Sequence, residues 1–332
     1  MNAIRNERGV TILEVTVSLA LLLVVSTIFY EAYIGTMRAG EFLESHGDLN
    51  QYGQKAVNTI KADLMQGRFL FQNDTLGQGY TNHITLTGFA PQTDSRLPQI
   101  DVNGTLVPDT GTQTRVGNSL LIARQVAPLP MQIDVNSDGT TETVLADRYQ
   151  FYAVFTAQNP ARRFAGQNYY LDLVTATSPM YADYFQLMGY TAAVRSQIVA
   201  NMVASGVTMA WNNGQTIDNA FYTMASSGNL TGPIAAPTIT MPATSLIPQL
   251  KGGRVSGNMV YSVGVTATPA IASVDPVSQF AIPTGNFPGG FETLVVGPAG
   301  ARKIMIRLCL LSQYGDKINS QVNFVTTTTQ QM

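Results

Sequence analysis

The amino-acid sequence predicts an α+β protein in which one long N-terminal helix packs on a β-rich globular head that contains a single inserted helix. Three observations support this fold class. An apolar run without Gly or Pro covers residues 15–30, helical periodicity continues to about Gly67, and short alternating runs separated by turn residues follow from Tyr80 onward. We expect three regions: residues 10–34 as an apolar helix, 35–67 as its amphipathic continuation and 68–332 as the head.

The apolar helix is long enough to cross a membrane, because about 20 residues at about 1.5 Å each match a hydrocarbon core about 30 Å thick. Glu14 is the only charged residue between positions 10 and 30. An ionised carboxylate inside such a helix costs about 3 kcal/mol, so Glu14 is a functional candidate that needs a partner. Arg5 and Arg8 precede the helix and acidic residues follow it. The positive-inside rule therefore predicts a cytoplasmic N-terminus and an exported head.

A short leader suggests how that partner arises. Gly9 and Val10 form a small-then-apolar junction, and cleavage between them would release residues 1–9, create a free amine at Val10 and leave Glu14 as the fifth residue. An ordinary secretory signal peptide and a plain signal anchor are the alternatives. Neither accounts for Glu14, and the apolar run is too long for a secretory signal.

This segment resembles the N-termini of type IV pilins and of the related pseudopilins of type II secretion. Their pattern is a basic leader, Gly, an apolar residue, Thr, apolar residues, Glu and a long apolar helix; Gly9, Val10, Thr11 and Glu14 occupy these positions. Val10 departs from the pattern, because Phe is commonest there. The resemblance covers residues 1–35. It implies that a prepilin peptidase cleaves between Gly9 and Val10, that the Val10 amine is N-methylated, and that Glu14 pairs with the amine of a neighbouring subunit.

The size and layout of the head look most like those of the larger minor subunits, the W-type minor pilins and J-type pseudopilins. The resemblance therefore implies a structural subunit that primes and assembles a type IV pilus or a type II secretion pseudopilus, within a tip complex. The implied partners are the prepilin peptidase, other minor and major pilins or pseudopilins, and the inner-membrane assembly platform. The implied location is the bacterial inner membrane, single-pass with the head in the periplasm, and then the filament or cell surface.

An alternative from another class is a pilin-anchored surface-binding, or adhesin-like, module whose ligand contacts the low-charge region 196–250. Deleting a priming subunit abolishes filaments, whereas deleting an adhesive one leaves filaments that no longer bind. Nucleic-acid binding is not expected, because only 12% of residues are charged and the net charge is -2.

The sequence contains no motif that indicates an enzyme. The two histidines, His46 and His83, have no metal-site spacing with Cys or Asp, and the chain lacks a nucleophile elbow, a P-loop and a dinucleotide fingerprint. The one cysteine, Cys309, lies in an alternating apolar run and is expected to pack in the core. We therefore expect no catalytic residue and no resident cofactor.

The amphipathic continuation carries an apolar stripe at spacings of three and four. The stripe consists of Leu49, Tyr52, Ala56, Ile60 and Leu64. Gly67 is the expected C-terminal cap. Four glycines weaken the middle of the helix by about 1 kcal/mol each relative to Ala, so we expect a bend or a frayed stretch there. They are Gly35, Gly40, Gly47 and Gly53.

In the head, the clearest predicted strands are 83–87, 119–123, 148–155, 258–265 and 303–311. The inserted helix is expected near residues 179–205, with Ser178 as its N-cap, Pro179 at its first position and Gly206 as its stop. Residues 226–248, rich in Ser, Thr, Pro and Ala, are expected to form a long loop.

One segment imitates half of a calcium loop. Asp134, Asn136 and Asp138 place oxygen ligands at positions 1, 3 and 5, and Gly139 follows at position 6. A calcium interpretation makes these three residues ligands, with Glu142 as a fourth. The second half of the motif is missing, because position 12 is a leucine. Asp-Gly and Asn-Gly between strands are also ordinary turn chemistry, and residues 99–105 repeat the pattern, which suggests the same turn used twice.

Overall fold

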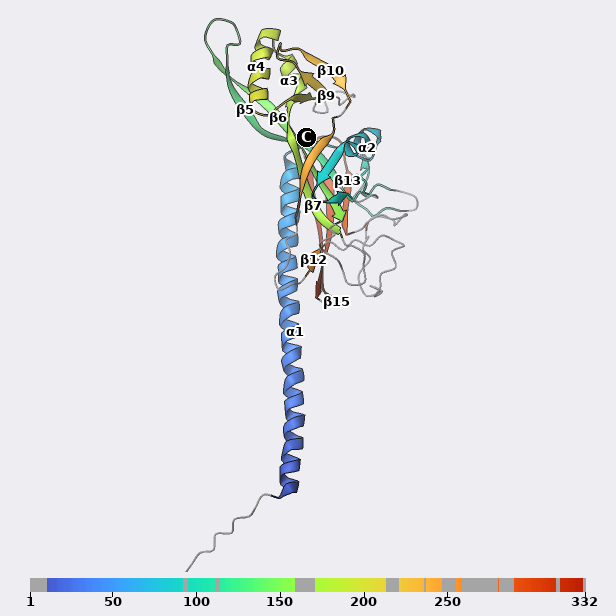
Figure 1. Ribbon diagram of the computed structural model, residues 1–332. Helices are drawn as coiled ribbons and strands as arrows, with labels where there is room; N and C mark the ends of the chain where they lie inside the picture. Colours follow the sequence, from blue (N-terminus) through green and yellow to red (C-terminus); the bar gives the residue numbers. More distant parts are fainter. Residues whose placement is uncertain are drawn as a thin grey trace, which may run out of the picture.

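The computed structural model describes residues 11–91, 95–110, 114–158, 171–212, 221–235, 237–246, 255–257, 280, 290–314 and 317–330. One long helix, α1, projects from a β-rich head made of two sheets and shorter helices, as Figure 1 shows. The expected α+β layout of a long N-terminal helix followed by a β-rich head is thus confirmed. The expected strand 258–265 lies outside the described residues.

Helix α1 (Ile12–Met65) contains 54 residues and is about 80 Å long. Figure 1 shows it as one uninterrupted rod, so the bend expected at its glycines is not observed. The cost of each glycine is offset because the helical hydrogen bonds continue through them and the second half of α1 packs on the head. The expected cap was off by one residue: Gln66 ends the helix, and Gly67 begins the first strand.

The first sheet is mostly antiparallel and follows the order β1-β5-β6-β7-β8-β9-β10, with β2, β3 and β11 attached beside this path. Its strands are β1 (Gly67–Leu70), β2 (Ile84–Thr87), β3 (Ala90–Pro91), β5 (Leu120–Ile133), β6 (Glu142–Gln158), β7 (Leu171–Asp183), β8 (Met209–Trp211), β9 (Phe221–Met224), β10 (Leu230–Ile234) and β11 (Ile239–Ser245). The second sheet contains β4 (Ile100–Asp101), β12 (Val255–Gly257), β13 (Phe291–Val296), β14 (Arg302–Tyr314) and β15 (Lys317–Gln330).

The main core forms where α1 packs against both sheets. Leu49, Ile60 and Leu64 of the apolar stripe are fully buried there. The alternating residues of β14 face the same core, as their pattern predicted; they are Ile304, Ile306, Leu308 and Leu310. The thiol of Cys309 is also buried, as expected for a packing residue.

A second, aromatic core lies beneath a helix that the sequence pattern did not predict, α2 (Thr75–Asn82). Asp74 caps this helix, and Tyr80, where we expected β-structure to begin, lies within it. Trp211 is completely buried, and its indole nitrogen donates a hydrogen bond to the Tyr80 hydroxyl over 3.2 Å.

The expected inserted helix is corrected in two respects. Ser178 and Pro179 belong to β7, because the Ser178 hydroxyl accepts a hydrogen bond from the backbone of Phe151 on β6 instead of capping a helix. Two helices follow, α3 (Tyr184–Met188) and α4 (Ala192–Ala204), and the side chains of Asp183 and Thr191 cap them.

The expected long loop 226–248 is also corrected, because it contains β10 and β11. Strand β11 pairs in parallel with β2 and antiparallel with β7. These pairings with distant strands override the turn-rich composition of the segment.

Candidate functional site

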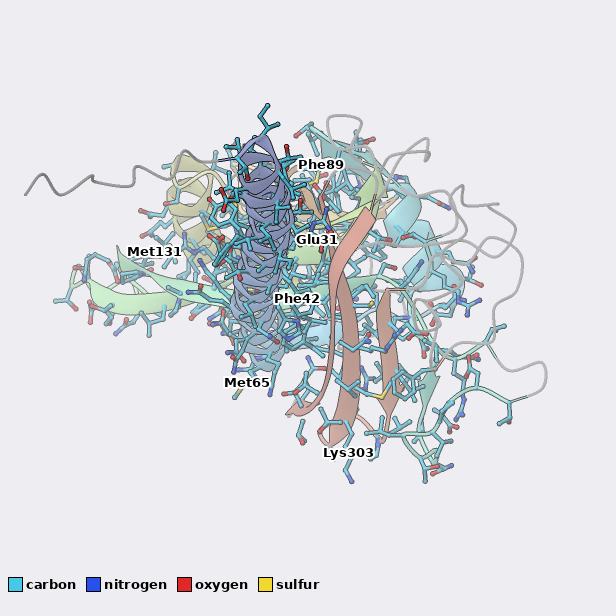
Figure 2. All side chains as sticks on the ribbon, turned by 90° about the horizontal axis from the view of Figure 1, so that it is seen from below. Glu31, Phe42, Met65, Phe89, Met131 and Lys303 are labelled. Atoms are coloured by element: carbon cyan, nitrogen blue, oxygen red, sulfur yellow. The ribbon has the colours of Figure 1, made fainter. Side chains whose placement is uncertain are left out.

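The first half of α1 is exposed to its surroundings. It is long and apolar enough to span a membrane, and the head buries none of its most apolar stretch. Figure 2, which looks along α1 from below, shows side chains projecting from the helix on all sides. The first α1 residue that the head buries is Ser45.

The projecting part of α1 is longer than a bilayer requires. Residues 12–44 extend about 50 Å below the head, whereas a hydrocarbon core is about 30 Å thick. Glu31 is the first charged residue after the apolar run. Residues 31–44 therefore form a stalk about 20 Å long between the apolar run and the head.

Thr11 and Glu14 form a reciprocal capping box at the start of α1. The Glu14 amide donates to the Thr11 hydroxyl over 3.3 Å, and the Thr11 amide and hydroxyl donate to Glu14 Oε2 over 2.9 and 3.1 Å. This arrangement satisfies helix N–H groups and places the carboxylate at the positive end of the helix dipole. A carboxylate has about four acceptor positions, so the capping box leaves capacity for a cation.

Gly9 and Val10 lie outside the described residues, so cleavage and methylation at that junction stay predictions. Glu14 lies in the first turn of the exposed apolar helix α1. Its link to Thr11 was not foreseen. A signal was present, because Thr-x-x-Glu before an apolar run is the sequence signature of a capping box.

Side-chain contacts fix the second half of α1 to the head. Asp63 forms an ion pair with Arg124 of β5, and the Arg124 guanidinium lies 5.0 Å from the ring centroid of Tyr152. Burial, together with the Asp63 carboxylate, raises the pKa of the Tyr152 hydroxyl above its ordinary value. Lys61 donates to the Thr326 hydroxyl of β15 over 3.2 Å. These contacts join residues far apart in the chain, so no local sequence signal announces them.

The second half of α1 also packs closely on β15 at Gly53. A Cβ atom added at this position would lie 2.0 Å from Cε2 of Phe324 on β15, so the aromatic ring occupies the space that a side chain would need. Gly47, six residues earlier, has no heavy atom within 4 Å of its added Cβ. Gly53 is therefore a packing position, and Gly47 is not.

The segment considered for calcium forms the loop between β5 and β6. The Asp134 carboxylate accepts hydrogen bonds from the Asp138 and Gly139 amides, at 3.1 and 3.0 Å, and Glu142 accepts one from the Val135 amide at 3.1 Å. Hydrogen bonds from the hydroxyl and amide of Thr140 hold the pKa of Asp138 below its ordinary value. The acidic groups thus cap amides of their own loop.

Two residues of this loop have left-handed backbone conformations. They are Ser137, with φ of 59°, and Gly139, with φ of 85°, which a glycine adopts without steric cost.

Within the described residues, no three His, Cys, Asp or Glu side chains gather as a metal site. Asn136 is not among those residue types, so the calcium interpretation stays a prediction.

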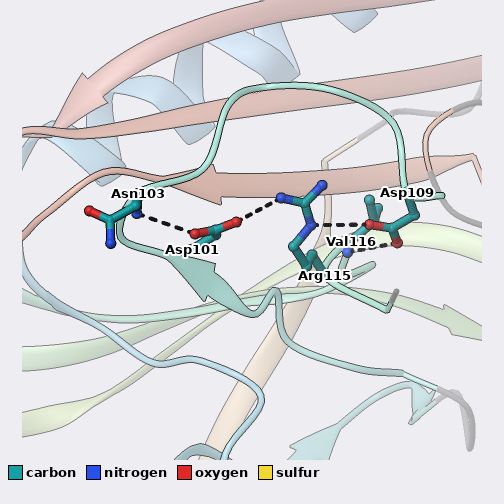
Figure 3. A network of polar contacts seen from close by, with 5 residues as sticks. All are labelled: Asp101, Asn103, Asp109, Arg115 and Val116. Carbon is teal, nitrogen blue, oxygen red and sulfur yellow. Dashed lines mark hydrogen bonds and ion pairs between the residues drawn. The ribbon is translucent and has the colours of Figure 1, made fainter. Parts of the chain in front are cut away.

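The related segment around Asp101 has a different role, shown in Figure 3. Asp101 accepts from the Asn103 amide at 3.2 Å, as a turn residue does, but it also forms an ion pair with Arg115 over 2.9 Å. Arg115 reaches Asp109 as well, over 3.6 Å, and Asp109 accepts from the Val116 amide at 3.3 Å. This network joins β4 to the following loop, and the single guanidinium of Arg115 is shared between two carboxylates.

Comparison of the chain with known protein families, with characterised proteins and with solved structures gave no significant match.

Proposed function

We propose that this chain is a minor pilin or pseudopilin, a membrane-anchored structural subunit that helps to prime and assemble a type IV pilus or a type II secretion pseudopilus. The observation that carries the proposal is the exposed apolar half of α1, with Glu14 held in its first turn by Thr11. An acid at that depth is costly unless a cation meets it, and a processed N-terminus on a neighbouring subunit supplies one.

The proposed mechanism has three steps. A prepilin peptidase cleaves after Gly9 and methylates the Val10 amine. The apolar helix then holds the subunit in the inner membrane until an assembly platform extracts it. In the filament, Glu14 neutralises the N-terminal amine of a neighbour within a dry helical bundle. Removing one partner of such a buried charge pair costs about 3–5 kcal/mol, which is enough to block incorporation.

The rigid connection between α1 and the head supports this mechanism. The helix is continuous over its 54 residues, and ionic, polar and aromatic contacts fix its second half to the two sheets. Movement of the membrane helix is therefore transmitted to the head.

The deciding experiment is the intact mass and N-terminal sequence of the protein made with and without a prepilin peptidase. We expect a mature chain that begins at methylated Val10 only when the peptidase is present. An uncut chain, or cleavage after the apolar run, would refute the proposal. A peptidase variant without proteolytic activity provides the matched control.

A further inference from the structure

We propose that the outer edge of β15 is a docking edge for an extended strand of a different protein subunit. β15 is paired along one side only. It pairs with β14 from Tyr314↔Lys317 to Arg302↔Gln330, while β12 and β13 pair with the opposite edge of β14. Within the described part of the chain, no strand pairs with the outer side of β15. Such an edge presents a row of backbone donors and acceptors that another strand can complete.

Within residues 320–330, β15 lacks the side chains and the bulges that usually block strand addition. Natural edge strands carry charges, Pro or bulges, or they are short. Residues 318–330 contain no charged residue and no Pro. The register shift in the β14–β15 pair lies near its hairpin end, and pairing is regular from Ser320 to Gln330. Val325 is 53% exposed, and the four threonines that follow it favour extended structure.

Helix α1 covers a face of β15, not its edge. Phe324 packs on Gly53, and Thr326 accepts a hydrogen bond from Lys61. In the β14–β15 ladder these two residues pair with Leu308 and Ile306, whose side chains face the main core. The contacts with α1 therefore come from alternate residues on one face. Residues 323, 325, 327 and 329 are exposed on the other face.

The direction of β15 argues against a symmetric pair in which β15 of one copy docks on β15 of a second copy. Phe324 lies at Gly53, Thr326 at Lys61 and Gln330 at Gly67, so β15 runs in the same direction as α1. Antiparallel twofold pairing of two β15 edges would therefore point two α1 helices in opposite directions. Two copies anchored in one membrane with the same orientation cannot adopt that arrangement. This step rests on the membrane anchoring in the proposed function.

The chemistry of the edge defines the partner. Backbone groups supply the hydrogen bonds, and the side chains of residues 318–330 are neutral, so this part of the edge fits an uncharged, Pro-free extended segment. We assign that segment to a neighbouring subunit of the same assembly. Such pairing is directional, because one subunit gives the strand and the other gives the edge. It specifies a neighbour without closing a symmetric pair.

Site-specific crosslinking tests the proposal in the full-length chain, expressed in cells that make its assembly. The photoreactive residue p-benzoylphenylalanine replaces Val325, and the matched control carries it at Val203 of α4, which is 47% exposed. We expect an adduct from position 325 only, to one short segment of a different protein. An adduct with a second copy, an adduct with the same chain, or no adduct would overturn the proposal.

A pair of proline variants tests the role of the backbone. Neighbouring N–H groups of a strand point to opposite edges, so Thr327→Pro and Thr328→Pro differ in which edge loses a donor. One variant loses a bond to β14 and destabilises the head, while the other removes an outward donor and leaves the head folded. We expect loss of the adduct in the folded variant, and an undiminished adduct there would refute strand addition. The N-terminus of the chain that carries the photoreactive residue at position 325, without either proline, is determined from the same cells. An absent adduct on a cleaved chain refutes strand addition, whereas an uncut chain refutes the processing step.

Discussion

Replacing Gly53 by Ala tests how tightly α1 is seated on the head. The new methyl group would lie 2.0, 2.5 and 2.8 Å from three ring atoms of Phe324, so the ring must move and lose packing. Overpacking of this kind costs about 1–3 kcal/mol. The same substitution gains about 1 kcal/mol of helix propensity.

Gly47→Ala is the matched control, because it gains the same helix propensity and meets no neighbouring atom. The propensity terms cancel between the two variants. The difference in their free energies of unfolding therefore isolates the overpacking at Phe324, and we expect Gly53→Ala to be less stable by about 1–3 kcal/mol. Phe324→Leu in the Gly53→Ala background should recover part of the loss, because a smaller side chain leaves room for the methyl group.

The assay is urea unfolding of the full chain in detergent micelles, followed by the fluorescence of Trp211. This is the only tryptophan in the sequence, and it is completely buried in the head. Equal unfolding midpoints for the two alanine variants, or a more stable Gly53→Ala, would refute the packing role of Gly53.

Three further predictions concern the charges and the aromatic core. Glu14→Ala should block incorporation into filaments, measured in a sheared-filament assay, while the head stays folded. Glu14→Gln is the control, because it keeps a capping side chain without the charge. Equal failure of both variants assigns the defect to the lost charge. Glu292→Ala should destabilise the head by about 3–5 kcal/mol in urea unfolding, because it leaves Arg307, buried and paired at 2.7 Å, without its carboxylate; normal stability would show that the pair is dispensable. Burial raises the pKa of Tyr80 to about 12 from 10.0, so the folded state holds this proton more tightly and up to about 2–3 kcal/mol of stability is lost as the pH rises from 10 toward 12. Tyr80→Phe should reduce that loss in urea midpoints measured at both pH values, and an unchanged pH dependence would contradict the assignment.

Strong periodic patterns predicted the main elements well. The helix expected to about residue 67 ends at Met65, and the alternating run 303–311 lies within β14. Local signals failed where distant pairing decided the outcome. Ser178 and Pro179 have the chemistry of a helix start, but pairing with β6 places them in a strand. Within 226–248, β11 likewise depends on the distant strands β2 and β7, whereas β10 forms a local hairpin with β9 that its composition did not predict.

The candidate site divides in the same way. The position of Glu14 and its capping box are readable within four residues of sequence. The contacts that join α1 to the head are not readable in this way, because Asp63 contacts Arg124 61 positions later and Lys61 contacts Thr326 265 positions later. Contacts between residues so far apart in the sequence arise from the topology of the two sheets, which no short motif encodes.

The lengthwise packing of α1 on β15 has a mechanical consequence. The hydrogen bonds between β14 and β15 lie across the strands, and β15 runs in the same direction as α1. A force that pulls α1 along its axis, as the proposed extraction from a membrane would, therefore loads these bonds in shear. Bonds loaded in shear resist together, whereas bonds peeled from one end fail one after another. The β14–β15 pair therefore resists traction along α1 better than it would if the same load peeled the two strands apart.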